Sequence, residues 1–255
     1  MKKIARWIVL SPYLDVFGAG LVLVVALWRN FHLTFYINGQ IDWNVPLAEH
    51  WQTILNGGFP IGYLSTIGAV FSLLSTRFVG KQSNIGNWIS LATTANSGAV
   101  DYFLGNTSAI ITYPLTFLIH TFAVYKWRKG VKIRKVDVWY YLIFIVGILI
   151  AYSLVFLSLA VFNQQFDFYL SLPDKSQFFF YNIVAVTFGL SLGANFCTVF
   201  KYESTYLNWT IYNIIQLIKA VFQLNIANIA KYIFYLFNAI LTLFDWVLNR
   251  DRAKA

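Results

Sequence analysis

The chain is poor in cysteine, histidine and charge. It has one cysteine, Cys197, three histidines and 11% charged residues, whereas soluble domains carry about 25% charged residues. A single cysteine excludes a disulfide framework and a cysteine-based metal site. The sequence contains no His-Glu-x-x-His motif and no Gly-rich phosphate loop, so it supports neither a zinc hydrolase nor an ATP-driven pump. We expect neither a metal nor a cofactor.

Apolar residues dominate the sequence. Hydrophobic residues make up 58% of the 255 positions, and the mean hydropathy is +0.61. A water-soluble protein could not bury this much apolar surface, so the composition predicts a membrane protein. A transmembrane helix needs about 20 mostly apolar residues. Eight stretches meet this requirement: residues 10–28, 60–78, 86–104, 108–126, 137–162, 177–200, 205–223 and 226–247.

Basic residues are concentrated in alternate loops between these stretches. The loop 126–135 contains six, and others lie at the N-terminus, near 77–81, at 201 and in the tail 250–254. Lys and Arg stay on the cytoplasmic side of a membrane. Eight spans with an internal N-terminus place every basic loop on that side, so we expect both termini to be cytoplasmic. This distribution also explains the isoelectric point near 9.5 without a nucleic-acid partner.

A longer polar stretch, residues 38–58, separates the first two spans. Pro46 suits the first position of a helix, and Trp51 is typical of the lipid headgroup region. Residues 46–55 are therefore predicted to form a short interfacial helix. A lid over an outer vestibule is the alternative.

The spans contain an internal repeat. Asn87-Trp88 and Asn208-Trp209 each open a span, and Trp127 and Trp246 each close a group of three spans, 39 and 37 residues after Trp88 and Trp209. We predict an all-α membrane protein with two three-helix repeats, in which one helix links two units of the same orientation (3+1+3). Parallel repeats of this kind hold substrate near the midplane between them. The predicted parts are an N-terminal helix and polar segment (1–58), a first repeat (60–127), a linking helix (137–162) and a second repeat (177–247).

Amide and aromatic side chains recur on one face of these spans. Residues four and seven apart share a helix face, and amides in a membrane helix must find partners inside the bundle. They either form a pocket or hold helices together, since both uses are common. The candidate pocket residues are Trp88, Asn96, Tyr113, His120, Asn182, Trp209, Asn213, Gln216, Tyr235 and Asn238.

Three charged residues lie inside predicted spans, near their outer ends. Asp101 is a further candidate site residue, because an intramembrane carboxylate can attract a cationic substrate. It can equally pair with a neighbouring helix or with Lys219. Lys219 and Lys231 are expected to extend to the headgroups.

The segment Lys201-Tyr-Glu-Ser-Thr-Tyr-Leu-Asn-Trp209-Thr-Ile-Tyr-Asn213 resembles the PnuC nicotinamide riboside transporters, which have a similar Lys-Tyr start followed by a Trp and, four residues later, an Asn. The stretch from Tyr113 to Lys129 is similar to the end of that family's first repeat, except that His120 stands where an Asn is expected. The likeness covers residues 60–247.

The resemblance implies a SWEET-like 3+1+3 core in a bacterial inner membrane and a homotrimer. It also implies facilitated diffusion of nicotinamide riboside, with a cytoplasmic riboside kinase that traps the substrate by phosphorylation. A flat cationic ring suits stacking on Trp, and its carboxamide and ribose suit Asn and Gln. The residues alone leave other flat vitamins open, such as thiamine or riboflavin. A membrane scaffold and an intramembrane enzyme are the more distant alternatives.

Overall fold

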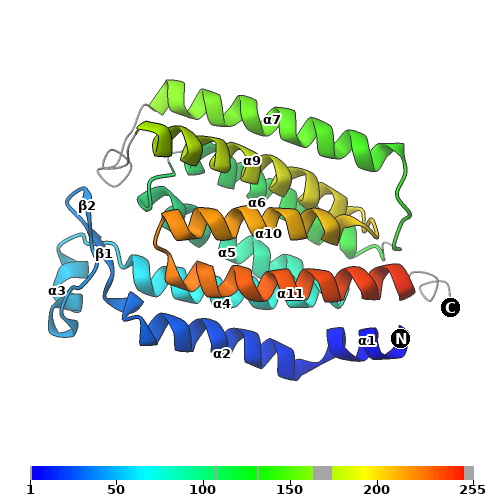
Figure 1. Ribbon diagram of the computed structural model, residues 1–255, viewed down its shortest axis with the longest axis horizontal. Coiled ribbons are helices and arrows are strands. Elements are labelled where there is room, and N and C mark those ends of the chain that lie inside the picture. The colour runs from blue at the N-terminus through cyan, green and yellow to red at the C-terminus, as the bar shows by residue number, and fades with distance from the viewer. Residues whose placement is uncertain (1, 107, 131, 163–173, 250–255) are drawn as a thin grey trace.

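The computed structural model describes residues 2–106, 108–130, 132–162 and 174–249. Long helices occupy the eight stretches selected by hydropathy, and they run along one common direction as a bundle (Figure 1). The start of the first helix and the end of the last helix lie at one end of the bundle, here called the terminal end. The bounds of these helices are α2 Pro12–Trp28, α4 Ile61–Gly80, α5 Asn84–Phe103, α6 Ala109–Trp127, α7 Val138–Phe162, α9 Asp174–Val199, α10 Thr205–Phe222 and α11 Ile226–Asn249.

Smaller elements complete the ends of the bundle. A first helix, α1 (Lys2–Leu10), precedes α2 at a bend of 49° beside Pro12. At the opposite end, the hairpin end, lie η1 (Phe31–Leu33), strands β1 (Phe35–Ile37) and β2 (Gln40–Asp42), η2 (Leu47–Glu49) and α3 (His50–Leu55). The predicted short helix over 46–55 is therefore present. The two-stranded antiparallel hairpin was not predicted, and it makes the fold mostly rather than entirely helical.

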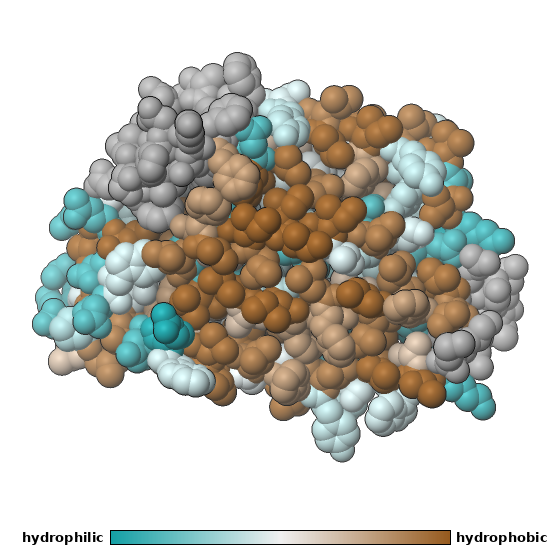
Figure 2. All heavy atoms as spheres, in the orientation of Figure 1, coloured by the Kyte–Doolittle hydropathy of each residue, from teal (hydrophilic) through white to brown (hydrophobic). Residues whose placement is uncertain are grey.

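Three described helices are long and apolar enough to cross a membrane by length and composition: Ile61–Gly80, Asn182–Val199 and Ile226–Leu248. The bent pair α1 and α2 adds a fourth when it is counted as one span. Helices such as α5 fall short because they carry polar residues, among them the buried Asn87, Thr94 and Asp101. The face of the bundle seen in Figure 2 is largely hydrophobic, with polar residues gathered towards its ends. The chain is a multi-pass membrane protein, and the count of eight spans remains a prediction.

The helices form two groups with matching contacts. α4 packs on α5 and α5 on α6, while α9 packs on α10 and α10 on α11. The groups meet where α4 contacts α11 and where α6 contacts α9. In Figure 1, α4 and α9 run in the same direction, from the hairpin end to the terminal end. The last helix of each group thus lies against the first helix of the other.

Helix α7 lies on the outside of the bundle against α9 (Figure 1). A Cβ added at Gly147 of α7 would lie 2.9 Å from the backbone nitrogen of Gly193 in α9, and one added at Gly193 would lie 2.6 Å from the Phe144 ring. Real Cβ atoms do not come this close, so glycine at both positions is what lets the two backbones touch.

A buried arginine ties the terminal end together. Arg77 of α4 is 1% exposed. It donates to Asp15 Oδ1 and Asn238 Oδ1 at 2.7 Å each, and to the carbonyl oxygens of Val9 and Ser11. One guanidinium therefore joins α1, α2, α4 and α11. Because Arg presents five donors in a rigid fork, no other side chain could hold these four acceptors at once.

Two loops also meet at the terminal end, outside the helices. The loop before α7 pairs with the turn after α9, through Arg134 N to the Lys201 carbonyl and Glu203 N to the Arg134 carbonyl, both at 2.9 Å. Tyr202 donates to Asp137 Oδ1 at 2.9 Å. Burial and this bond raise the pKa of Tyr202 to about 12. Partial burial opposes ionisation of Asp137, but hydrogen bonds from Tyr202 and the Tyr140 backbone hold its pKa below the usual value.

Candidate substrate site

A cavity of about 210 Å³ lies between the two helix groups, with residues of α4, α5, α6, α9, α10 and α11 in its wall. Each group therefore contributes three helices, as expected for a site between repeats. Eight of the eleven predicted site residues line the cavity: Asn96, Asp101, Tyr113, His120, Trp209, Asn213, Gln216 and Tyr235.

The other three predicted residues lie elsewhere. Trp88 is 47% exposed, and its ring lies against the Arg128 guanidinium. Asn238 is buried and does not line the cavity, and its Oδ1 accepts from Arg77. Asn182 lies in α9 away from the lining.

Helix α10 presents an indole and two amides to the cavity. Trp209 donates from Nε1 to Thr198 Oγ1 at 2.9 Å and packs edge-on against the Tyr212 ring. Gln216 donates from Nε2 to the Tyr212 hydroxyl at 2.6 Å. The side-chain oxygens Asn213 Oδ1 and Gln216 Oε1 are buried and have no hydrogen-bond partner within the described part of the chain. Two acceptors four and seven residues beyond an indole ring are thus available to a ligand.

The other predicted residues serve the wall in different ways. Asn96 donates to the Leu64 carbonyl oxygen at 2.9 Å, which ties α5 to α4. His120 lies on α6 and Tyr235 on α11, on the two sides contributed by different groups. The amide nitrogen of Asn96 therefore holds two helices together, which is the alternative to a role in a pocket.

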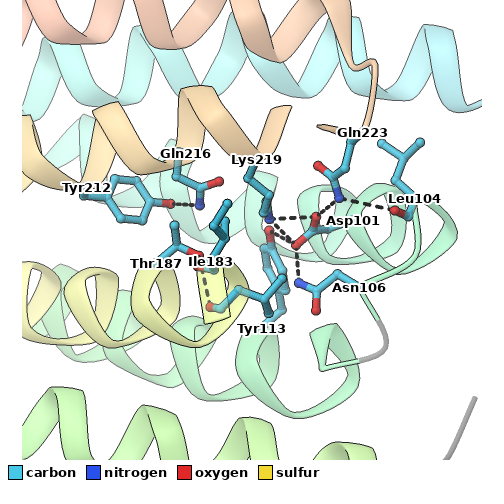
Figure 3. A network of polar contacts seen from close by, with 11 residues as sticks. Asp101, Leu104, Asn106, Tyr113, Ile183, Thr187, Tyr212, Gln216, Lys219 and Gln223 are labelled. Atoms are coloured by element: carbon cyan, nitrogen blue, oxygen red, sulfur yellow. Dashed lines mark hydrogen bonds and ion pairs between the residues drawn. The ribbon is translucent and has the colours of Figure 1, made fainter. Parts of the chain in front are cut away.

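The hairpin end of the cavity holds one closely bonded charge cluster (Figure 3). Lys219 Nζ lies 2.8 Å from both carboxylate oxygens of Asp101. Asp101 also accepts from Gln223 Nε2 at 2.7 Å, Asn106 Nδ2 at 2.5 Å and the Tyr113 hydroxyl at 3.3 Å. The carboxylate is therefore matched by four donors drawn from α6, α10 and the turns that follow α5 and α10.

The sequence correctly suggested the Asp101–Lys219 pair as one possibility, but the predicted positions of Lys219 and Lys231 were wrong. Lys219 is 5% and Lys231 is 7% exposed, and both line the cavity instead of extending to the headgroups. The helical periodicity gave a signal for this, because Lys219 falls three residues after Gln216, on the same face of α10. Gln223 and Tyr212 also belong to this face and were not predicted.

The fold and the cavity together define a class, a multi-pass helical membrane protein with a polar site between two three-helix groups. The model of the family described as nicotinamide mononucleotide transporter matches residues 62–248, and the chain belongs to that family. It is therefore a transporter and not an enzyme. The resemblance seen in the sequence is confirmed.

A solved structure described as the crystal structure of the vitamin B3 transporter PnuC has the same fold. The similarity covers 92% of each chain with a TM-score of 0.61 and 17% sequence identity. The search of curated proteins gave no match.

Proposed function

We propose that the chain carries nicotinamide riboside across the membrane by facilitated diffusion through the central cavity. One observation supports this most directly: the free acceptors Asn213 Oδ1 and Gln216 Oε1 lie on the same helix face as Trp209. An indole stacks on a flat cationic ring, while amide oxygens accept from a carboxamide and from ribose hydroxyls. The indole and the amides are uncharged, so they bind a cation without a strong ion pair that would slow its release.

We propose that the two three-helix groups, within 60–127 and 177–247, are parallel repeats offset by 119 residues, with the helix over 137–162 as their link. The turns support this register. Gly105 and Leu224, both with positive φ, occupy the same place in the α5–α6 and α10–α11 turns. The next residues, Asn106 and Asn225, donate backbone bonds of 3.0 Å to residues five positions earlier.

The hydrogen bonds between helices support the same offset. Trp127 Nε1 donates to the Val199 carbonyl at 3.2 Å, and Trp246 Nε1 donates to the Gly80 carbonyl at 2.9 Å. Each bond joins the last helix of one group to the end of the first helix of the other. Both the donors and the acceptors are 119 residues apart, as expected for a two-fold relationship.

This register corrects the alignment of Trp88 with Trp209. At an offset of 119, the counterpart of Trp209 is Ser90, which lines the cavity, and the counterpart of Trp88 is Leu207, which is 51% exposed. The Asn-Trp match in the sequence is two residues out of register. Two residues turn a helix by about 200°, so the shift exchanges the inward and outward faces.

We further propose an orientation in the membrane, an oligomeric state and a means of trapping the substrate. The start of α1, the end of α11 and the described basic residues between α6 and α7 lie at the terminal end, and the positive-inside rule favours a cytoplasmic location for that end in a bacterial inner membrane. A homotrimer and a cytoplasmic riboside kinase that traps the substrate follow from the resemblance to the PnuC family.

Calorimetry on the purified protein tests the substrate. We expect nicotinamide riboside to bind and thiamine to give no heat. Asn213→Ala and Gln216→Ala should each weaken riboside binding about 10-fold or more, while the size-exclusion profile stays unchanged. Heat with thiamine but not with the riboside would overturn the substrate assignment. Loss of assembly before loss of binding would favour a scaffold instead.

A further inference from the structure

An exposed stripe of side chains on α6 changes from apolar to basic towards the terminal end. Its helical members are Leu118, Phe122 and Tyr125, which share one face at intervals of four and three residues and are 63%, 39% and 56% exposed. Lys129, in the turn after α6, continues the stripe, since its Nζ lies 4.6 Å from the centroid of the Tyr125 ring. From Leu118 to the end cap at Arg128 the helix rises about 15 Å, which is about half the thickness of the hydrocarbon core.

Two lysines at this end of α6 lie on aromatic rings instead of beside carboxylates. Lys129 lies on Tyr125, and Lys126 Nζ lies 5.3 Å from the centroid of Phe200, in the turn after α9. The face of a ring attracts an ammonium group without neutralising its charge. Within the described part of the chain, neither lysine forms a salt bridge. Both charges are therefore available to an anion.

The corresponding stripe of α11 is apolar throughout. At the offset of 119, the counterparts of Leu118, Phe122, Tyr125 and Lys129 are Phe237, Leu241, Phe244 and Leu248. Phe237 and Phe244 are 52% and 57% exposed. Both helices thus present an apolar stripe to the surrounding lipid, and only the stripe of α6 ends on a cation.

The position of Lys126 also differs between the two groups. Its counterpart in α11 is Asp245, which is fully buried and accepts from Arg6 of α1 at 2.7 Å. Helix α1 packs on α11, so a part of the chain itself neutralises that end of the second group. A charge needed only to orient the chain could lie anywhere in the loop that follows α6. Its placement beside an exposed apolar stripe indicates an anionic molecule with an apolar part.

We propose that Lys126 and Lys129 bind the headgroup of an anionic phospholipid whose acyl chains lie along Leu118 and Phe122. Each ammonium supplies up to three donors to the phosphate oxygens, and basic sites beside membrane helices attract anionic headgroups. Tyr125 lies between the two parts, at the level where aromatic residues are enriched at the membrane surface. None of these five residues lines the central cavity, so the lipid site is separate from the substrate site.

Native mass spectrometry of the full chain tests this, with the protein released from micelles that contain equal amounts of phosphatidylglycerol and phosphatidylcholine. We expect the wild type to retain mainly phosphatidylglycerol. Lys126→Met/Lys129→Met should lower the ratio of the two retained lipids about 10-fold or more, since each cation at the surface contributes about 1 kcal/mol. Lys126→Arg/Lys129→Arg keeps both charges and should retain the preference. Lys132→Met/Lys135→Met removes two exposed lysines of the same loop and should change the ratio less than about twofold.

Thermal unfolding distinguishes a lipid from a free anion. Phosphatidylglycerol should raise the unfolding temperature of the wild type, whereas the same concentration of glycerol 1-phosphate, which has the phosphate but no acyl chains, should not. Equal stabilisation by the two would overturn the lipid site in favour of a free anion. Equal retention of both lipids by the wild type would overturn it outright, and equal losses in the two methionine double variants would show a diffuse attraction instead of a site. Lys129→Met and Lys132→Met give the same comparison with single charges if a double variant does not fold.

Discussion

Trp209 lines the central cavity, whereas Trp88, which follows Asn87 as Trp209 follows Asn208, is 47% exposed on the outside of the bundle. The two residues look alike in the sequence and have opposite environments. This contrast provides a matched pair of variants, since both remove an indole from the start of a helix but only one removes it from the cavity.

Trp209→Ala is expected to weaken binding of nicotinamide riboside by about 2- to 30-fold, because it removes a stacking surface worth about 0.5–2 kcal/mol and the indole that donates to Thr198. Trp88→Ala should leave the dissociation constant within about twofold. Calorimetry measures both. Equal losses in the two variants would mean that the indole acts through helix stability rather than through contact with the substrate.

Lys219→Met is expected to destabilise the protein by about 3–5 kcal/mol, because it leaves Asp101 buried without its countercharge. The double variant Asp101→Asn/Lys219→Met removes both charges and should recover most of that loss. Unfolding in detergent, followed by tryptophan fluorescence, measures the difference. If the double variant lost as much free energy of unfolding as the two single variants together, the two charges would contribute independently.

Trp127→Phe and Trp246→Phe are expected to cost about 1–3 kcal/mol each, since each removes the donor to a carbonyl at the end of a helix in the other group. The repeat relationship predicts losses of similar size. Denaturant unfolding of the two single variants makes the comparison. A large loss in one and none in the other would argue that only one of these bonds joins the two groups.

Arg77→Met is expected to destabilise the terminal end by about 3–5 kcal/mol, because four acceptors on three helices and the α1–α2 bend lose their shared donor. Arg77→Lys should restore only part of this, because one ammonium cannot reproduce the guanidinium fork. Arg134→Met, which removes an exposed arginine, serves as the control. Thermal unfolding of the three variants gives the ranking, and full restoration by Lys would refute the role of the fork.

Hydropathy was sufficient to locate the long helices, because an apolar run of about 20 residues has few other uses. Trp127 and Trp246, which the sequence pairs as the last residues of the two predicted repeats, are 119 residues apart, the offset that the proposed repeat uses. Periodicity selected the inward face of α10, from Trp209 through Asn213 to Gln216, because one polar stripe there faces the cavity.

Other features depend on contacts that a single sequence does not reveal. Trp88 was assigned to the cavity on a dipeptide match, but the register of a helix is decided by packing, and a shift of two residues moves a side chain to the other face. Lys219 and Lys231 look like lysines at a membrane boundary, and only the position of Asp101 on another helix shows that Lys219 has a buried partner. The hairpin of β1 and β2 is too short to give an alternating pattern.

The backbone contact between Gly147 and Gly193 determines where this chain can be divided. Cutting the chain between residues 128 and 137 keeps α7 in the same fragment as α9, against which it packs. Cutting the chain after α7 places these two helices in different fragments. Two fragments made by the first cut and produced together in one cell should reassemble into a working carrier more readily than fragments made by the second.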